Sequence, residues 1–482
     1  MKHIKTIALS LLALAGGCIE DKGNYNYSAL NEITIEGITA DTTFRVDQFE
    51  TLAIAPALRF SGKPHANLSY EWKINYEVVS ADSVLNEQIS LEPNTATAYY
   101  AASLAVTDND TGLKYYKNFR VNVTTSVSIG LFILRELPNG DATLSFQRRD
   151  RPDAAIAHDL FEGANPAFGP LGKKPKMIYY KGNLNVQLGV LCSEGERKLS
   201  LLNPSNMKLN RALSAETIIG GYSGDFSPAY LQLYMGGMIA AGGKLFNYNY
   251  MGNESIYSPV ITDTIEFADW ADTNNSIDAY AWLGYDNKGE RFLQLEPGRN
   301  SLLYDKITPL PVQGGFSTTG QKFLAGGTRG MLVRAITHDP AAQKAYLYGL
   351  EMIDDMNWDT WEMVINTTVT RFSEITNLIN AQTVCFYNAE YWYLANGGVI
   401  NRLHEMATEP VLWFTAPKGN VTTMIAKTGS SAGGTNRLLI ATYDGSKSYI
   451  HEINLATREQ IREPIEVEGK VVSLLAKGNW TH

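Results

Sequence analysis

The residues best suited to hold a ligand lie in one polar stretch, "MIDDMNWDTWEM", at 352–363. Asp355 and Asp359 flank Trp358, and Trp361 follows three positions after that tryptophan. Indole rings stack on the apolar faces of sugars, and carboxylates accept hydrogen bonds from hydroxyl or amide groups. The stretch is therefore a candidate platform for a sugar or an extended peptide. The alternative is a helical turn that covers a sheet edge with both tryptophans facing inward.

Two other aromatic residues are candidates because their neighbours are polar. Trp270 lies in "FADWADTNNSIDAYAW" (267–282), and Tyr222 lies in "IGGYSGDFSPAY". Both stretches are rich in Gly, Ser, Asn and Asp, which is typical of loops. The sequence therefore predicts that both rings are exposed and available to a ligand. "EYWYLA" (390–395) alternates instead, which favours core packing of its aromatic rings.

No pattern in the chain predicts a catalytic residue, a metal site or a cofactor. There is no His-Glu-x-x-His, no Gly-x-Ser-x-Gly, no Cys-x-x-Cys and no phosphate-binding Gly-rich loop ahead of a helix. Asp108 and Asp110 in "DNDTG" resemble the opening of a calcium loop, but the closing glutamate is missing, so a hairpin turn is favoured. The 50 acidic residues always offer pairs of carboxylates, so catalysis by such a pair stays open.

Composition argues against partners that attract basic proteins. The 482 residues carry a formal net charge of −9 without any basic block, so nucleic acid is a poor partner. Aromatic residues make up 11% of the chain, which suits β-structure and binding faces. Cys192 and Cys385 each lie in an apolar, strand-like run, which predicts buried free thiols rather than a disulfide or a metal pair.

Residues 1–17 have the layout of a secretory signal: two lysines, an apolar run and two glycines. The apolar run is shorter than the ~20 residues that a membrane span needs. Cys18 follows at once, and this arrangement resembles a bacterial lipobox, which implies that Cys18 is acylated and anchors the chain by lipid. Glu20 and Asp21 resemble the export signal of Bacteroidota surface lipoproteins, which implies the outer face of the outer membrane. Residues 18–30 are then a tether.

Residues 31–127 contain short alternating runs between turns, which predicts an immunoglobulin-like β-sandwich. Two of these runs are joined by "DNDTG", where Gly112 can adopt the positive φ that ends a hairpin turn. Trp72 sits in another alternating run, as the core tryptophan of such a sandwich does. "YEWKI" and "DNDTGLKYYKNFRVNV" resemble the PKD-like domain of Bacteroidota surface lipoproteins, which implies a spacer and interaction module.

Residues 128–482 repeat one unit, in which an apolar run, a turn rich in Gly, Asn or Asp, and a second run follow one another. Seven units begin at 130, 188, 242, 280, 331, 383 and 438, at intervals of 58, 54, 38, 51, 52 and 55 residues. A recurrence of about 50 residues is typical of blades that bury their faces against neighbours. The sequence therefore predicts an all-β chain whose second part is a β-propeller of seven blades. Consecutive β-sandwiches are the alternative, but each would need about 100 residues.

The resemblance to Bacteroidota surface lipoproteins implies a function that residue spacing does not reveal. It implies an outer-membrane, surface-exposed lipoprotein that is an accessory binding subunit of a SusC/SusD-type TonB-dependent nutrient uptake system. Its partners would be the membrane, through the lipid, the SusC/SusD-like transporter proteins, and a captured glycan or peptide. Two alternatives stay open: an extracellular polysaccharide-degrading enzyme on a propeller scaffold, and a structural subunit that contacts only the transporter proteins. The missing motifs favour binding over catalysis.

Overall fold

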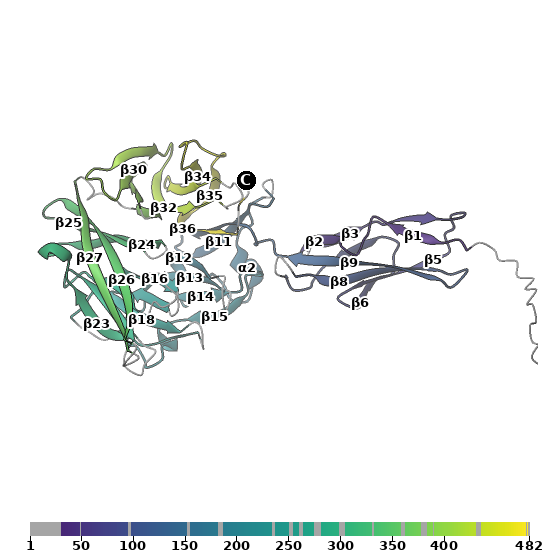
Figure 1. Ribbon diagram of the computed structural model, residues 1–482, viewed down its shortest axis with the longest axis horizontal. Helices are drawn as coiled ribbons and strands as arrows, with labels where there is room; N and C mark the ends of the chain where they lie inside the picture. Colours follow the sequence, from purple (N-terminus) through teal and green to yellow (C-terminus); the bar gives the residue numbers. More distant parts are fainter. Residues whose placement is uncertain are drawn as a thin grey trace, which may run out of the picture. The chain divides into compact units, whose positions relative to one another are not determined.

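The computed structural model describes residues 30–48, 50–94, 98–151, 155–181, 187–233, 237–249, 254–259, 264–273, 281–297, 304–329, 332–357, 362–376, 383–388, 390–429, 435–478 and 480. Two compact units divide the chain, Met1–Thr124 and Thr125–His482. Their described elements are strands, apart from α2 (Leu160–Ala164) and two short 3-10 turns (Figure 1). This confirms the all-β prediction. No helix among the described residues is long and apolar enough to cross a membrane.

The first unit is a β-sandwich. Its strands are β1 (Ile33–Glu36), β2 (Thr43–Asp47), β3 (Thr51–Ile54), β4 (Ala57–Phe60), β5 (Leu68–Ile74), β6 (Glu77–Ser80), β7 (Leu85–Gln88), β8 (Tyr100–Asp108) and β9 (Lys114–Thr124). One sheet has the order β2-β9-β8-β5-β6, with β2 and β9 parallel, while β1 pairs with β4 and β3 with β7. Side chains along β1 and β3 alternate between buried and exposed, so both pairs turn one face to the core.

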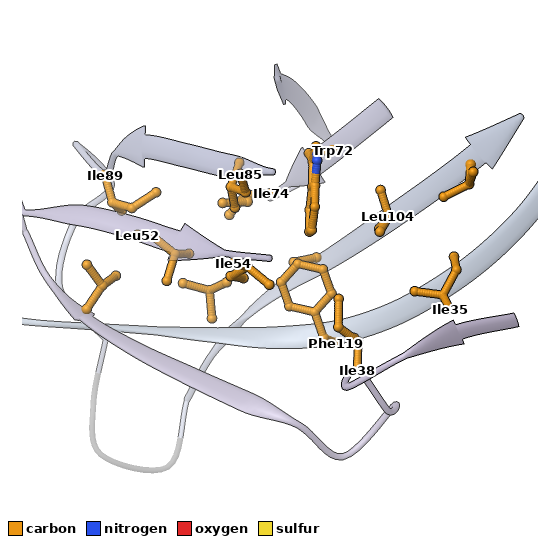
Figure 2. Close-up of a cluster of buried hydrophobic side chains, with 14 of the residues drawn as sticks. Ile35, Ile38, Leu52, Ile54, Trp72, Ile74, Leu85, Ile89, Leu104 and Phe119 are labelled. Carbon is orange, nitrogen blue, oxygen red and sulfur yellow. The ribbon is translucent and has the colours of Figure 1, made fainter. Parts of the chain in front are cut away.

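Trp72 of β5 belongs to the core of this sandwich (Figure 2). Its side chain is fully buried, and its ring meets Phe119 edge-on with 6.1 Å between centroids. The indole N–H donates to the carbonyl of Asp82 at 2.8 Å, so burial leaves no donor unsatisfied. Ile35 and Ile54 pack into the same cluster from the two-stranded pairs. The predicted core tryptophan is therefore confirmed.

The turn between β8 and β9 is the hairpin that "DNDTG" predicts. Gly112 has φ +72°, a conformation in which a side chain would be strained. Its N–H donates to the carbonyl of Asp108 at 2.7 Å. The carboxylate of Asp108 accepts the N–H of Asp110 at 2.9 Å, which is the usual way in which an aspartate stabilises a turn.

The second unit contains seven sheets in the part of the chain that the structure describes. Six have four antiparallel strands: β12 (Lys173–Lys181), β13 (Gln187–Glu194), β14 (Leu199–Leu202) and β15 (Leu209–Leu213); β16 (Pro228–Leu233), β17 (Gly237–Ala241), β18 (Lys244–Asn249) and β19 (Ser255–Ile256); β20 (Phe267–Asp272), β21 (Trp282–Asp286), β22 (Arg291–Pro297) and β23 (Tyr304–Leu310); β24 (Lys322–Arg329), β25 (Leu332–Asp339), β26 (Lys344–Asn357) and β27 (Glu362–Thr376); β28 (Thr383–Asn388), β29 (Tyr391–Asn396), β30 (Val399–His404) and β31 (Val411–Thr415); β32 (Asn420–Lys427), β33 (Arg437–Tyr443), β34 (Lys447–Asn454) and β35 (Ile465–Glu468). The seventh joins β36 (Lys470–Lys477) to β10 (Gly130–Glu136) and β11 (Ala142–Arg148).

The last strand closes these sheets into a ring. β36 pairs antiparallel with β10, so both ends of the unit share one sheet. The leading strands contact one another in a circuit, β12 to β16, β20, β24, β28, β32, β36 and back to β12. These seven strands therefore surround the axis of a seven-bladed β-propeller, which confirms the predicted ring. Because the ring is closed, each of its described sheets has a neighbouring sheet on both of its faces.

Apolar clusters fill the interfaces between neighbouring sheets. Trp270 of one sheet shares a cluster with Val333 of the next, and Tyr393 shares another with Ile440. Each blade thus buries its faces against its neighbours, as the repeat predicts.

Cys192 and Cys385 are both buried thiols, as predicted. Burial raises the pKa of both thiols to about 12, so roughly one in ten thousand is ionised at pH 8. We expect neither thiol of the folded protein to react with iodoacetamide at pH 8, and both to react in urea. Peptide mass spectrometry measures this, and alkylation of either residue before unfolding would show that its strand opens readily.

Candidate functional site

A polar pocket lies on the face of the ring at which the innermost strands begin. β12, β16 and β20 line it, and the β17–β18 and β21–β22 turns complete its rim. The pocket has a volume of about 330 Å³ and is lined by Lys176, Ser193, Ser227, Ala229, Gly242, Gly243, Glu266, Phe267, Asp269 and Asn287. Three neighbouring sheets build this pocket, which we call the first axial pocket.

Backbone geometry fixes the rim of the first axial pocket. Gly242 and Gly243 have φ of +55° and +72°, as a two-residue hairpin turn of this kind requires. The N–H of Phe267 donates to the carbonyl of Gly243 at 2.9 Å, and the N–H of Asn287 donates to the carbonyl of Glu266 at 2.7 Å. The glycine pair therefore forms a turn between two strands.

Three charged side chains line the first axial pocket. Lys176, Glu266 and Asp269 are all exposed to solvent. Within the described part of the chain, none of the three side chains makes an ion pair or a hydrogen bond. Surrounding protein atoms raise the pKa of the Asp269 carboxyl, and the charge of Lys176 opposes this shift. Lys176 and Asp269 thus interact through their charges, and all three charged groups are exposed to a ligand in the pocket.

These groups suit a ligand that is rich in hydroxyl groups. Carboxylates accept hydrogen bonds from hydroxyls, and the ammonium of Lys176 donates to oxygen. The hydroxyl of Ser193 donates to the carbonyl of Lys174 at 3.2 Å, and that of Ser227 donates to the carboxylate of Asp225 at 2.6 Å. Both serine oxygens can still accept a hydrogen bond. Because acceptors predominate, a neutral polyol such as a sugar matches the pocket better than an anion does.

A second polar pocket opens on the same face of the ring. It has a volume of about 340 Å³ and is lined by Thr383, Asn420, Val421, Thr422, Tyr443 and Lys470. Three of these residues are the first of β28, β32 and β36, whereas the first axial pocket uses β12, β16 and β20. The two pockets therefore lie on the same face of the ring, beside different innermost strands.

The prediction that Trp270 lies exposed in a polar loop is wrong. Trp270 belongs to β20 and is only 2% exposed. Its ring stacks on Phe323 with 4.8 Å between centroids and 19° between planes. Gly326 approaches so closely that a Cβ atom there would lie 2.5 Å from the indole. Neighbouring sheets cover this strand, so its ring is not available to a ligand.

Tyr222 lies half-buried on the loop that precedes β16. Its ring meets Phe246 edge-on with 5.1 Å between centroids. The loop reaches the first axial pocket only at Ser227. A ligand contact for Tyr222 therefore stays a prediction.

Much of the stretch at 352–363 forms strands rather than a loop. β26 continues to Asn357 and β27 begins at Glu362, so that Asp355 pairs with Val364 across the hairpin. Outside the described residues lie Trp358, Asp359, Trp361, Cys18, Glu20 and Asp21. The platform, the acylation and the export signal therefore stay predictions.

Sequence reasoning missed the charged residues of the first axial pocket. Lys176 lies in "GKKPKMIYY", and Glu266 and Asp269 lie in "TIEFADW". In both runs the charges look like the solvent-facing residues of ordinary strands. One signal could have identified these residues. They lie near the start of the first strand of a blade, and the first strands of all blades surround the axis of a propeller.

The chain is a β-sandwich followed by a seven-bladed propeller, and both polar pockets belong to the propeller. A sequence model of the PKD-like family matches residues 18–175. This match covers 158 (175 − 18 + 1) of the 482 residues and includes the whole sandwich with β10 and β11. Over this part the chain is similar to the PKD-like family. No curated protein matches the sequence.

Several solved structures share features of the fold at low sequence identity. A quinonprotein alcohol dehydrogenase-like protein from Bacteroides thetaiotaomicron is 13% identical, with a TM-score of 0.45 over 93% of this chain and 99% of that chain. An auxiliary nutrient binding protein from the same organism is 11% identical, with a TM-score of 0.32 over 82% and 92%. The β-propeller domain of Cps50 (Swd1) from Myceliophteria thermophila is 9% identical, with a TM-score of 0.31 over 61% and 96%. Values this low carry no information about ligand or activity.

Proposed function

We propose that this protein is a lipid-anchored, surface-exposed lipoprotein of the outer membrane that captures a glycan. The observation that carries the proposal is the group of exposed charged side chains of Lys176, Glu266 and Asp269 that line one pocket on a face of the ring. A sugar offers many hydroxyls to these acceptors, and it needs no reactive group in return. An extended peptide is the other ligand that the sequence leaves open.

The N-terminal sequence supports the anchoring part of the proposal. Cys18 follows a secretory signal, and Glu20 and Asp21 follow Cys18. The match to the PKD-like family begins at Cys18, which is the first residue that would remain after cleavage of the signal. Along the chain, a tether and a β-sandwich then separate the lipid from the ring. This order suits a binding unit held away from the membrane.

The proposed partners are the SusC/SusD-like proteins of a TonB-dependent uptake system. The support is the resemblance of the N-terminal region to lipoproteins of such systems. In this arrangement the ring binds the nutrient and the transporter moves it. The protein needs no catalytic residue for this role, which agrees with the absence of catalytic motifs in the sequence.

We expect the double variant Glu266→Gln, Asp269→Asn to bind its glycan at least tenfold more weakly than the native protein. Hydrogen bonds to charged groups contribute about 1.5–3 kcal/mol each, and 1.4 kcal/mol corresponds to a factor of ten. Affinity electrophoresis in gels that contain single polysaccharides identifies the ligand and gives the dissociation constants. A peptide panel run in parallel tests the other ligand class.

Glu409→Gln is the matched control, because Glu409 is exposed on the β30–β31 loop at the other end of the ring. Unchanged binding by both the double variant and the control would exclude the first axial pocket. Trp358→Ala and Trp361→Ala would then test the predicted aromatic platform. Release of shorter sugars from a bound polymer would identify an enzyme instead, with Glu266 and Asp269 as the available carboxylates.

A further inference from the structure

A histidine and two aspartates meet at one end of the β-sandwich. His65 lies in the β4–β5 loop, Asp108 is the last residue of β8, and Asp110 lies in the β8–β9 turn. One ligand atom from each residue lies within 4.8 Å of the other two. The hairpin motif that resembles the opening of a calcium loop thus gains a third donor from a distant part of the sequence. This group belongs to a different unit from the axial pockets.

In each carboxylate of this group one oxygen accepts a hydrogen bond and the other lies near the imidazole, and Thr111 also donates hydrogen bonds to the carboxylate of Asp108. Oδ1 of Asp108 accepts the N–H of Asp110 at 2.9 Å, and Oδ1 of Asp110 accepts the side-chain amide of Asn67 at 2.5 Å. The two Oδ2 atoms lie 3.6 Å from Nε2 and 3.7 Å from Nδ1 of His65. Hydrogen bonds that orient ligating carboxylates in this way are typical of metal sites.

Both distances to the imidazole are longer than a hydrogen bond, and each runs to a different ring nitrogen. Hydrogen bonds from nitrogen to oxygen in proteins span about 2.7–3.2 Å. Two ligands bound at ~2.0–2.1 Å to a tetrahedral ion lie about 3.3–3.5 Å apart. Nδ1 of His65 is also buried without a hydrogen-bond partner among the described residues. One ligand atom from each residue already lies within 4.8 Å of the other two, so a shift of the side chains by about 1 Å would let one ring nitrogen and both carboxylates share a cation.

We propose that His65, Asp108 and Asp110 bind a divalent first-row transition cation, for which Zn²⁺ is the probe. An imidazole nitrogen with two carboxylate oxygens suits Zn²⁺ or Mn²⁺, whereas Ca²⁺ takes oxygen ligands. The carboxylate of Asp108 is almost fully buried and that of Asp110 is exposed, so water reaches the site from one side and completes the coordination.

The cation would hold the β4–β5 loop of the sandwich to the β8–β9 turn. The loop that carries His65 is held to the first described residues of the chain, since the amide of Asn31 donates to the carbonyl of Lys63 at 2.8 Å and accepts the N–H of Gly62 at 2.7 Å. Binding at Asp108 and Asp110 would add a second link to the hydrogen bond from Asn67 that already joins this loop to the β8–β9 turn. The proposed ion therefore stiffens the junction at which the tether meets the sandwich.

We expect the mature full-length chain, after EDTA treatment, to bind one Zn²⁺ in calorimetric titration at pH 7.5. His65→Asn and Asp110→Asn should each weaken this binding at least tenfold, because each removes one of three protein ligands. Asp110 is exposed, so its variant keeps the fold even where a change at buried Asp108 would not. His404→Asn, at a half-buried propeller histidine, is the matched control and should leave the affinity unchanged.

Two results would overturn the proposal. One is the absence of Zn²⁺ binding up to millimolar concentration, or equal affinity in native protein and in His65→Asn. The other is tighter binding of Ca²⁺ than of Zn²⁺ at the same residues, which would contradict the proposed ligand class. Co²⁺ gives an independent readout, since its absorption spectrum should lose intensity in His65→Asn but not in His404→Asn. Glycan binding is measured separately, so failure here leaves the proposed function unaffected.

Discussion

Replacing Glu452 with glutamine is expected to lower the free energy of unfolding of the propeller by about 3–5 kcal/mol. The side chain of Glu452 is 2% exposed, and it meets three guanidinium groups. Nη2 of Arg149 lies 2.8 Å and Nε of Arg462 lies 3.2 Å from one carboxylate oxygen, and Arg437 pairs with the other. Without the carboxylate charge, the two buried cations of Arg149 and Arg437 would repel each other.

The same cluster lies where the ring closes. Arg149 follows β11 in the closing sheet, whereas Glu452 and Arg437 belong to β34 and β33 of the preceding sheet. The ring of Trp480, just after β36, covers the guanidiniums of Arg149 and Arg437, with centroid distances of 4.8 and 5.6 Å. Burial lowers the pKa of Arg149 to about 10, and the charge of Glu452 opposes this shift. The glutamate therefore favours the charged form of a buried arginine where the ring closes.

Chemical denaturation measures the loss, and hydrogen exchange of the β36 amides locates it. Glu466→Gln is the control, because its ion pair with Lys447 is half-exposed and such pairs contribute about 0–1 kcal/mol. Equal stability of the two variants would mean that the Glu452 cluster does not stabilise the closing sheet of the ring. Faster exchange in β36 of Glu452→Gln alone would support the assignment.

Trp270→Ala is expected to lower the free energy of unfolding by about 3–5 kcal/mol, because it leaves a large cavity between two sheets. The indole of Trp270 is stacked on Phe323. Gly326 lies so close to the indole that a residue with a side chain would not fit at position 326. The space cannot be refilled by a small shift of one rotamer, since the lining strands belong to a closed ring.

Phe168→Ala is the control for this prediction. Phe168 is 51% exposed, and surface substitutions usually change stability by less than about 0.5 kcal/mol. Denaturation in urea and glycan affinity should be measured on both variants. A stable Trp270→Ala protein that no longer binds glycan would restore this tryptophan to the ligand site and contradict its placement in the core.

Features that depend on a few neighbouring residues could be predicted from the sequence. Alternation of apolar and polar residues predicted β8 and β9. The turn between them needs a residue with positive φ, and this requirement predicted the role of Gly112. The core position of Trp72 followed from the same alternation. Such features are local, because a strand has a period of two residues and a turn has few allowed conformations.

The repeat predicted the ring but not the boundaries of its blades. Most predicted units begin near the second strand of a sheet, but the unit at 242 begins in the β17–β18 turn. The unit at 383 begins at the innermost strand, β28. The short interval of 38 residues after 242 results from this displacement. Adjacent strands of a blade have similar patterns, so periodicity alone cannot tell which strand faces the axis.

By itself the sequence determined the strand pattern, the turns and the number of units, because each depends on residues close together in the chain. Only the tertiary structure decided that Trp270 is buried and that Lys176, Glu266 and Asp269 share a pocket. The tertiary structure also brought His65 to Asp108 and Asp110. The physical reason is that burial and proximity are set by which surfaces meet when sheets pack, and distant segments supply those surfaces.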